Sequence, residues 1–136
     1  MSHPPLFALV SAVYNVDRYL TEFFGSLDAQ SLDHSRLRIV LVDDGSEDAS
    51  AERCDEWANS TDFDVTVLRV SNGGQGAARN LGLEEVRDAD WVTFIDPDDF
   101  VDADYFERVD DFLSANEGIE LVSCHQQDYR EDLEVQ

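Results

Sequence analysis

The chain contains no lysine. All nine basic residues are arginine, they face 31 aspartates and glutamates, and the formal net charge is −22 at pH 7. A nucleic-acid-binding face needs clustered cations to neutralise phosphates, so we expect no nucleic-acid partner. The same charge repels an anionic nucleotide at long range, so binding one would require a local cation or screening by salt.

The sequence also lacks an apolar stretch near twenty residues and a basic amino-terminal region followed by an apolar one. We therefore expect no membrane span and a cytoplasmic location, at the inner membrane face if the full-length protein associates with a membrane. Cys54 and Cys124 lack the close spacing of a zinc or redox motif, and we interpret both as reduced core residues. His3, His34 and His125 follow no ligand or triad spacing and are interpreted as surface or terminal residues.

The hydrophobic content of 43%, in 136 residues, is enough for one folded domain spanning residues 1–136. Short apolar runs alternate with segments in which apolar residues recur at helical spacing. This alternation predicts an α/β fold with a mostly parallel, Rossmann-like sheet flanked by helices. The expected strands cover residues 6–14, 38–42, 65–70, 91–95 and 119–124, and the expected helices cover 17–30, 50–59, 77–87 and 104–113.

Polar residues follow three of these strands directly. Tyr14 and Asn15 follow the first strand, Asp43 and Asp44 the second, and residues 96–99 the fourth. In open parallel sheets, ligands bind beyond the carboxyl ends of the strands. We therefore expect these groups to converge on one site.

Three carboxylates stand within four residues at the end of the fourth strand: Asp96, Asp98 and Asp99. Close carboxylates repel one another unless a cation or a donor compensates. Oxygen ligands of this kind suit Mg²⁺ or Mn²⁺, which commonly bridge to nucleotide phosphates. The alternative is that Asp98 or Asp99 caps the following helix.

The other clusters allow similar pairs of interpretations. Asp43 or Asp44 can accept a hydrogen bond from a base or a ribose, or can cap the next helix. The glycine-rich loop at 73–76 has neither the dinucleotide fingerprint nor the lysine of a P-loop. Arg79, just after it, can reach a base, a phosphate or a carboxylate, and pairing with Asp43, Asp44 or Asp96 is compatible with that role.

Four segments together, at residues 10–15, 42–46, 76–82 and 94–99, resemble motifs in the amino-terminal half of family 2 glycosyltransferases of the GT-A fold. They read Val-Ser-Ala-Val-Tyr-Asn, Val-Asp-Asp-Gly-Ser, Gly-Ala-Ala-Arg-Asn-Leu-Gly and Phe-Ile-Asp-Pro-Asp-Asp. The resemblance implies a domain that binds a nucleoside-diphosphate sugar, most often a UDP-sugar. It also implies inverting glycosyl transfer assisted by Mn²⁺ or Mg²⁺.

Carried over to this sequence, the resemblance places Tyr14 beside the base, and Asp44, together with Asp43, on the base or ribose. Asp96 faces the ribose, and Arg79 closes over the base and nearby carboxylates. Six residues are thus expected to bind nucleotide: Tyr14, Asn15, Asp43, Asp44, Arg79 and Asp96.

Asp98 is expected to ligate the metal, with Asp99 as its neighbour or support.

The sequence departs from the family pattern in two respects. Ala12 stands where the family often has proline, which we expect to alter the strand end only modestly. The acceptor-binding half with its catalytic base is expected beyond residue 136, and we do not assign the acidic residues of the 128–134 tail as the base. We therefore expect a donor-binding fragment that is inactive alone, with a glycan, lipid-carrier or protein acceptor.

Two rival interpretations are a receiver domain and a non-catalytic α/β interaction domain. A receiver normally carries a lysine beside its phosphoacceptor, and its acidic pair follows the first strand rather than the second. The missing lysine therefore disfavours a receiver, whereas the interaction domain stays open.

We predict that stability rises with salt, because screening reduces repulsion among the 31 acidic side chains. Such a surface suits a salt-rich cytoplasm, although a genome biased toward arginine codons also explains the missing lysine. The melting temperature should increase between low and molar NaCl. A flat melting temperature would contradict the prediction.

Overall fold

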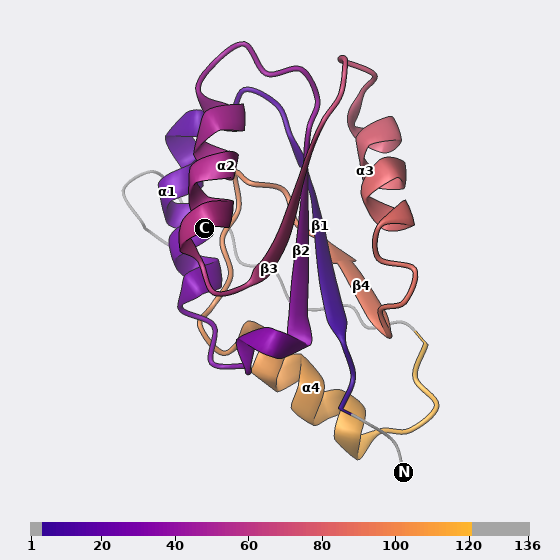
Figure 1. Ribbon diagram of the computed structural model, residues 1–136. Coiled ribbons are helices and arrows are strands. Elements are labelled where there is room, and N and C mark those ends of the chain that lie inside the picture. The colour runs from indigo at the N-terminus through magenta and orange to yellow at the C-terminus, as the bar shows by residue number, and fades with distance from the viewer. Residues whose placement is uncertain (1–3, 121–136) are drawn as a thin grey trace, which may run out of the picture.

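In the part of the chain that the structure describes, four parallel strands form a central sheet, and in Figure 1 they run side by side between the helices. The computed structural model describes residues 4–120. The strand order is β3-β2-β1-β4, and every described pair is parallel. The predicted α/β fold with a parallel sheet is thereby confirmed. The strands are β1 (Phe7–Val13), β2 (Leu37–Asp43), β3 (Asp64–Arg69) and β4 (Trp91–Phe94).

Helices cover both faces of the sheet (Figure 1). The first face carries α1 (Asp17–Asp28), α2 (Ser50–Ser60) and α4 (Tyr105–Ala115), and the second carries α3 (Gln75–Glu84). A short 3₁₀ helix, η1 (His34–Arg36), precedes β2.

The core consists of two clusters, one on each face of the sheet. Alternate residues of β1 enter opposite clusters, so that Leu9 packs among the residues of α1, α2 and α4, whereas Val10 packs toward α3. All seven residues of β1 are buried, which explains why its sequence is a continuous apolar run rather than an alternating one.

Several predicted details can be compared with the structure. The predicted 77–87 helix begins earlier, at Gln75, and ends at Glu84. The predicted strand at 119–124 falls mostly outside the described residues, and residues 119 and 120 are not in a strand. Cys54 is a buried free thiol, as predicted, and burial together with the nearby Asp43 charge raises its pKa to about 12. Cys124, His3 and His125 lie outside the described residues.

Within residues 4–120, none of the helices has the length and apolar content needed to cross a bilayer.

His34 is half-buried at the surface, with a side chain that is 21% exposed and stacks on Phe63 with 3.9 Å between ring centroids, contacts that the sequence did not predict. Its Nδ1 lies 2.6 Å from Asp62 Oδ1, and its Nε2 lies 3.0 Å from the carbonyl oxygen of Gln30. A neutral imidazole has only one N–H, so two acceptors favour the protonated ring.

Gly82 brings α3 close to the sheet, and we predict that Gly82→Ala is destabilising. An ideal Cβ there would lie 2.4 Å from Cγ1 of Val10 and 3.3 Å from Cγ2 of Val42. The overlap should cost about 1 to 3 kcal/mol, which exceeds the gain of about 1 kcal/mol in helix propensity. Urea unfolding measures the difference.

The matched control is Gly76→Ala in the same helix, where an added Cβ meets no atom within 4 Å. This variant should be as stable as the parent or more stable by up to about 1 kcal/mol. Equal effects of the two substitutions would show that α3 does not pack closely on β1.

His34 generates a pH prediction. Burial lowers its pKa, but the bonds to Asp62 and to the Gln30 carbonyl, with the charges of Asp62 and Asp28, outweigh burial and raise the pKa above 6.5. The protonated form therefore stabilises the fold fully below pH of about 6.5, and this stabilisation is lost as the pH rises through the folded-state pKa. The unfolding free energy, measured between pH 6 and 8.5, should decrease with pH more steeply for the parent than for His34→Gln. Identical slopes would contradict the assignment.

Candidate nucleotide and metal site

A pocket of about 200 Å³ lies at the carboxyl ends of the strands. Four of the predicted site residues line it: Tyr14, Asp44, Asp96 and Asp98. They come from the ends of three different strands, so the predicted convergence of the strand-end clusters is present in the structure. Four other predicted residues are not among those that line it: Asn15, Asp43, Arg79 and Asp99.

Asn15 joins the loops that follow β1 and β2. Its backbone is in the left-handed region, with φ of 51°, and its N–H donates to Ser46 Oγ at 3.0 Å. In return, the Glu47 N–H donates to Asn15 Oδ1 at 2.8 Å. Asparagine tolerates this backbone conformation better than most residues. Asn15 therefore fixes the backbone directly after Tyr14.

The same two loops are joined by further bonds. The Val16 N–H donates to Ser50 Oγ at 2.9 Å, and the Asp17 N–H donates to Asp48 Oδ2 at 3.2 Å. Together with the Asn15 contacts, these bonds hold one side of the pocket in place.

Asp44 connects β2 to the glycine-rich loop before α3. Asp44 is 3% exposed. Its Oδ1 accepts a hydrogen bond from the Gly73 N–H at 2.8 Å, and its Oδ2 accepts one from the Gly74 N–H at 2.9 Å. A carboxylate is favourable at a helix N-terminus, and α3 begins at Gln75. Asp44 thus does not cap α2. The two glycine N–H groups, which could otherwise face a phosphate, already have a carboxylate partner.

Asp43 does not line this pocket and lies near Cys54 of α2, whose pKa its charge raises. It is 4% exposed, and its Oδ2 accepts from the Ser46 N–H at 3.2 Å. Its Oδ1 is buried without a hydrogen-bond partner among the residues that the structure describes. Asp43 thus shapes the turn after β2, and α2 begins too far along, at Ser50, to be capped by it.

The acidic loop, which we define as residues 95–104, connects β4 to α4. One carboxylate oxygen from each of Asp96, Asp98 and Asp99 lies within 4.8 Å of the others. Two oxygens bound to the same Mg²⁺ are at most about 4.2 Å apart, so small side-chain rotations would place these three on one ion. An all-oxygen donor set with exposed Asp98 and Asp99 fits Mg²⁺ or Mn²⁺.

The alternative function of these carboxylates, helix capping, is wrong for Asp98 and Asp99. Helix α4 begins at Tyr105 and has Asp104 at its cap position, with no side-chain capping bond. The Asp99 N–H instead donates to the Asp96 carbonyl at 3.0 Å, which makes a turn around buried Pro97.

Arg79 reaches the acidic loop from α3. Its Nη2 lies 2.9 Å from Asp96 Oδ1, and the two side chains are 34% and 41% exposed. The sequence left Asp43, Asp44 and Asp96 open as ion-pair partners of Arg79, and the structure shows that the partner is Asp96. Arg79 brings a positive charge to the rim of a pocket lined by three carboxylates, namely those of Asp44, Asp96 and Asp98.

Sequence reasoning missed Ser11, which lies within the apolar run of β1. It is 1% exposed, and its Oγ donates to the Ile95 carbonyl at 2.5 Å, at the start of the acidic loop. A single hydroxyl residue inside a buried strand was the available signal, since a buried hydroxyl needs a partner.

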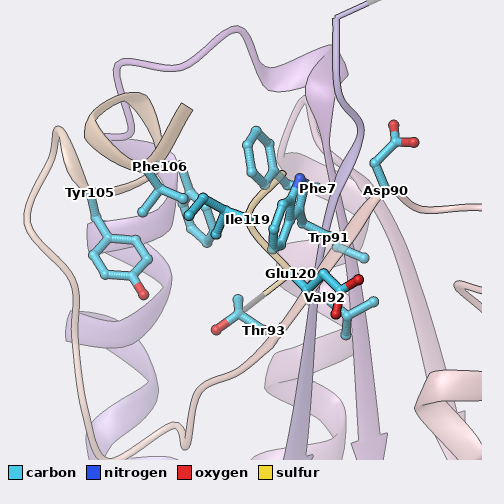
Figure 2. Close-up of a pocket in the computed structure, with 11 residues that line it drawn as sticks. Phe7, Asp90, Trp91, Val92, Thr93, Tyr105, Phe106, Ile119 and Glu120 are labelled. Carbon is cyan, nitrogen blue, oxygen red and sulfur yellow. The ribbon is translucent and has the colours of Figure 1, made fainter. Parts of the chain in front are cut away.

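A larger pocket, of about 460 Å³, lies between β4 and α4 and is drawn in Figure 2. Phe7, Trp91 and Phe106 line it, with Ile119 beside them, and none of the predicted site residues does. It includes Phe7 and Trp91, which begin β1 and β4, whereas the acidic loop follows the end of β4. Ligands in open parallel sheets bind at the carboxyl ends, so the smaller pocket is the candidate site.

The chain is similar in sequence to known proteins. The family model described as "Glycosyl transferase family 2" matches residues 9–134. Glycosyltransferase GlyA of Streptococcus pneumoniae is 38% identical over 101 residues, which are 74% of this chain and 14% of that protein. The minor teichoic acid biosynthesis protein GgaB of Bacillus subtilis is 33% identical over 118 residues, covering 86% of this chain and 13% of that protein.

Solved structures of Staphylococcus aureus TarS, residues 1–349, have a similar fold. The complex with UDP has a TM-score of 0.69 at 28% identity, over 81% of this chain and 32% of that chain. The complex with UDP-GlcNAc gives the same TM-score and identity.

The chain thus spans about a third or less of the length of these relatives, with 32% of the TarS chain as the largest share. The family match, by contrast, extends over almost all of the 136 residues. The chain belongs to glycosyl transferase family 2.

Proposed function

We propose that this chain is the donor-binding domain of an inverting glycosyltransferase and that it binds a UDP-sugar in the pocket at the carboxyl ends of the strands. The observation that carries the proposal is that Tyr14, Asp44, Asp96 and Asp98, from three strand ends, line one pocket. The TarS complexes with UDP and UDP-GlcNAc support uracil as the base. In this proposal residues 1–136 form a single domain.

The nucleotide contacts divide into direct and indirect ones. Tyr14 is 40% exposed at the pocket, which leaves its ring available beside a base. Asp44 keeps acceptor capacity beyond its two glycine bonds, since an ionised carboxylate has about four lone-pair sites. Asn15 and Asp43, which do not line the pocket, are proposed to act through the loops that they hold.

Arg79 and Asp96 act as a pair in this proposal. The ion pair at 2.9 Å holds Asp96 toward α3 through one oxygen and leaves its second oxygen for the ribose or a cation. Arg79 can then turn toward a bound base or phosphate, because its side chain is partly exposed. It is the local cation that a protein of formal charge −22 needs in order to accept an anionic donor.

Asp98 and Asp99, with Asp96, are the residues that would hold Mn²⁺ or Mg²⁺. When bound there, the cation supplies neutralisation of the charge that develops on the leaving diphosphate. The carboxylates of this chain contribute hard oxygen ligands and fix where the diphosphate lies relative to the base.

The catalytic base and the acceptor site are proposed to lie outside residues 1–136, since the chain covers only 13% to 32% of the relatives compared above. This chain alone should then bind donor but transfer little sugar. Acceptor choice among glycan, lipid carrier and protein belongs to the remaining part of such a protein.

The test is calorimetric titration with UDP, with and without Mn²⁺. Asp98→Asn removes a metal ligand, so the Mn²⁺-dependent part of the UDP affinity should fall at least about tenfold. Asp44→Ala removes the acceptor for Gly73 and Gly74, so UDP affinity should fall with or without Mn²⁺.

The matched control is Asp102→Asn, which changes an exposed carboxylate of the same acidic loop outside the metal cluster. This variant should bind Mn²⁺ and UDP like the parent. Equal losses for Asp98→Asn and Asp44→Ala would refute the division of roles. If neither UDP nor GDP binds the parent with Mn²⁺, the non-catalytic interaction domain becomes the better account.

A further inference from the structure

Gln30 is a buried amide, 5% exposed, two residues after the end of α1. Its Nε2 donates to the Ser26 carbonyl at 3.0 Å and to the Asp102 carbonyl at 2.6 Å. Its Oε1 accepts from the Phe106 N–H at 3.2 Å. Both amide hydrogens and the amide oxygen are thus used, and two of the three bonds reach a segment more than seventy residues away in the sequence.

The next residue strengthens the same connection. The Ser31 N–H donates to the Ala103 carbonyl at 2.8 Å, and Ser31 Oγ donates to Glu107 Oε1 at 3.0 Å. Gln30 and Ser31 therefore hold the end of the acidic loop and the first turn of α4 against the end of α1.

The beginning of the acidic loop is held separately. Ser11 Oγ donates to the Ile95 carbonyl at 2.5 Å, and Arg79 pairs with Asp96 at 2.9 Å. Asp98 and Asp99 lie between the two attachments. Three carboxylates within 4.8 Å repel one another, and a loop that is fixed at both ends resists their separation.

We propose that Gln30 is a positioning residue for the metal site: its amide fixes the end of the acidic loop and thereby keeps the carboxylates of Asp96, Asp98 and Asp99 close enough to share one divalent cation. This inference rests on the proposed function, because it assumes that the cluster binds a cation.

The geometry explains why glutamine serves at this position. Glutamate would keep the acceptor for the Phe106 N–H but would turn its second oxygen toward the carbonyls of Ser26 and Asp102, which cannot donate. Methionine has a similar length and fills the space, but it offers no donor and leaves the carbonyls of Ser26 and Asp102 and the buried Phe106 N–H without this partner.

The experiment is a titration of the full 136-residue chain with Mn²⁺ alone. Electron paramagnetic resonance measures the concentration of free Mn²⁺ at each point, which gives the Mn²⁺ affinity. Gln30→Met and Gln30→Glu should both weaken Mn²⁺ binding by about two- to thirty-fold, in line with the usual size of coupling through a packed structure. Unchanged Mn²⁺ affinity in both folded variants would overturn the proposal.

The matched control is Asp28→Ala, two residues earlier. Asp28 accepts from Trp57 Nε1 at 2.9 Å and from Thr61 Oγ1 at 2.7 Å, so its loss weakens the attachment of α1 to α2 without touching the acidic loop. It should lower the melting temperature and leave Mn²⁺ affinity unchanged. If Asp28→Ala lost as much Mn²⁺ affinity as the Gln30 variants, general destabilisation would explain all three losses, and the proposal would be overturned.

A measurement on the parent protein keeps the proposal testable if the Gln30 variants do not fold. Coupling is reciprocal, so Mn²⁺ must slow hydrogen exchange at the Phe106 and Ser31 amides if these attachments favour binding. The Thr61 amide, which donates to the Trp57 carbonyl, should not change. Equal exchange at Phe106 and Ser31 with and without Mn²⁺ would overturn the role of Gln30.

The outcomes also separate the two proposals. If the parent binds no Mn²⁺ with or without UDP, the metal-dependent function fails. If the parent binds Mn²⁺ and the Gln30 variants bind it equally well, the metal site stands and only the positioning role fails.

Discussion

The site depends on the carboxylate of Asp44, which bonds the N–H groups of Gly73 and Gly74 and so ties the end of β2 to the start of α3. Helix α3 then presents Arg79, which pairs with Asp96 at the end of β4. Two contacts, Asp44 with the glycine-rich loop and Arg79 with Asp96, thus link three strand-end loops, and the parallel sheet supplies the common edge at which they meet. Without the Asp44 bonds, the glycine-rich loop would lose its attachment to the end of β2, and α3 would be held to the sheet by the packing of Ala78 and Gly82.

The second constraint is electrostatic. The chain has nine arginines and 31 acidic residues, so few acidic side chains can form an ion pair. Arg79 lies at the rim of the pocket and pairs with Asp96. Arg36 pairs with Asp110 at 2.6 Å and so connects η1 to α4. The remaining repulsion within the acidic loop is opposed by attachments at both ends, through Ser11 and Gln30. In this account a cation binds to an acidic loop whose conformation is already fixed by these attachments.

Much of the fold followed from the sequence because β1 and β2 are apolar runs and α1 has regular apolar spacing. Tyr14, Asp44, Asp96 and Asp98 could be foreseen because they follow strands directly. The roles of Asn15 and Asp43 could not be foreseen, because residues adjacent in sequence point to opposite faces of a strand. The role of Gln30 could not be foreseen either, because its hydrogen bonds reach residues more than seventy positions away and leave no local pattern. The family match removes the receiver alternative.

The most direct test of the central claim is a crystal structure with UDP and Mn²⁺, in which anomalous scattering locates the ion. The account predicts an anomalous peak in contact with Asp98 and uracil beside Tyr14 and Asp44, in the pocket at the carboxyl ends of the strands. UDP in the larger pocket beside Trp91 and Phe106, or a manganese ion away from the acidic loop, would contradict it.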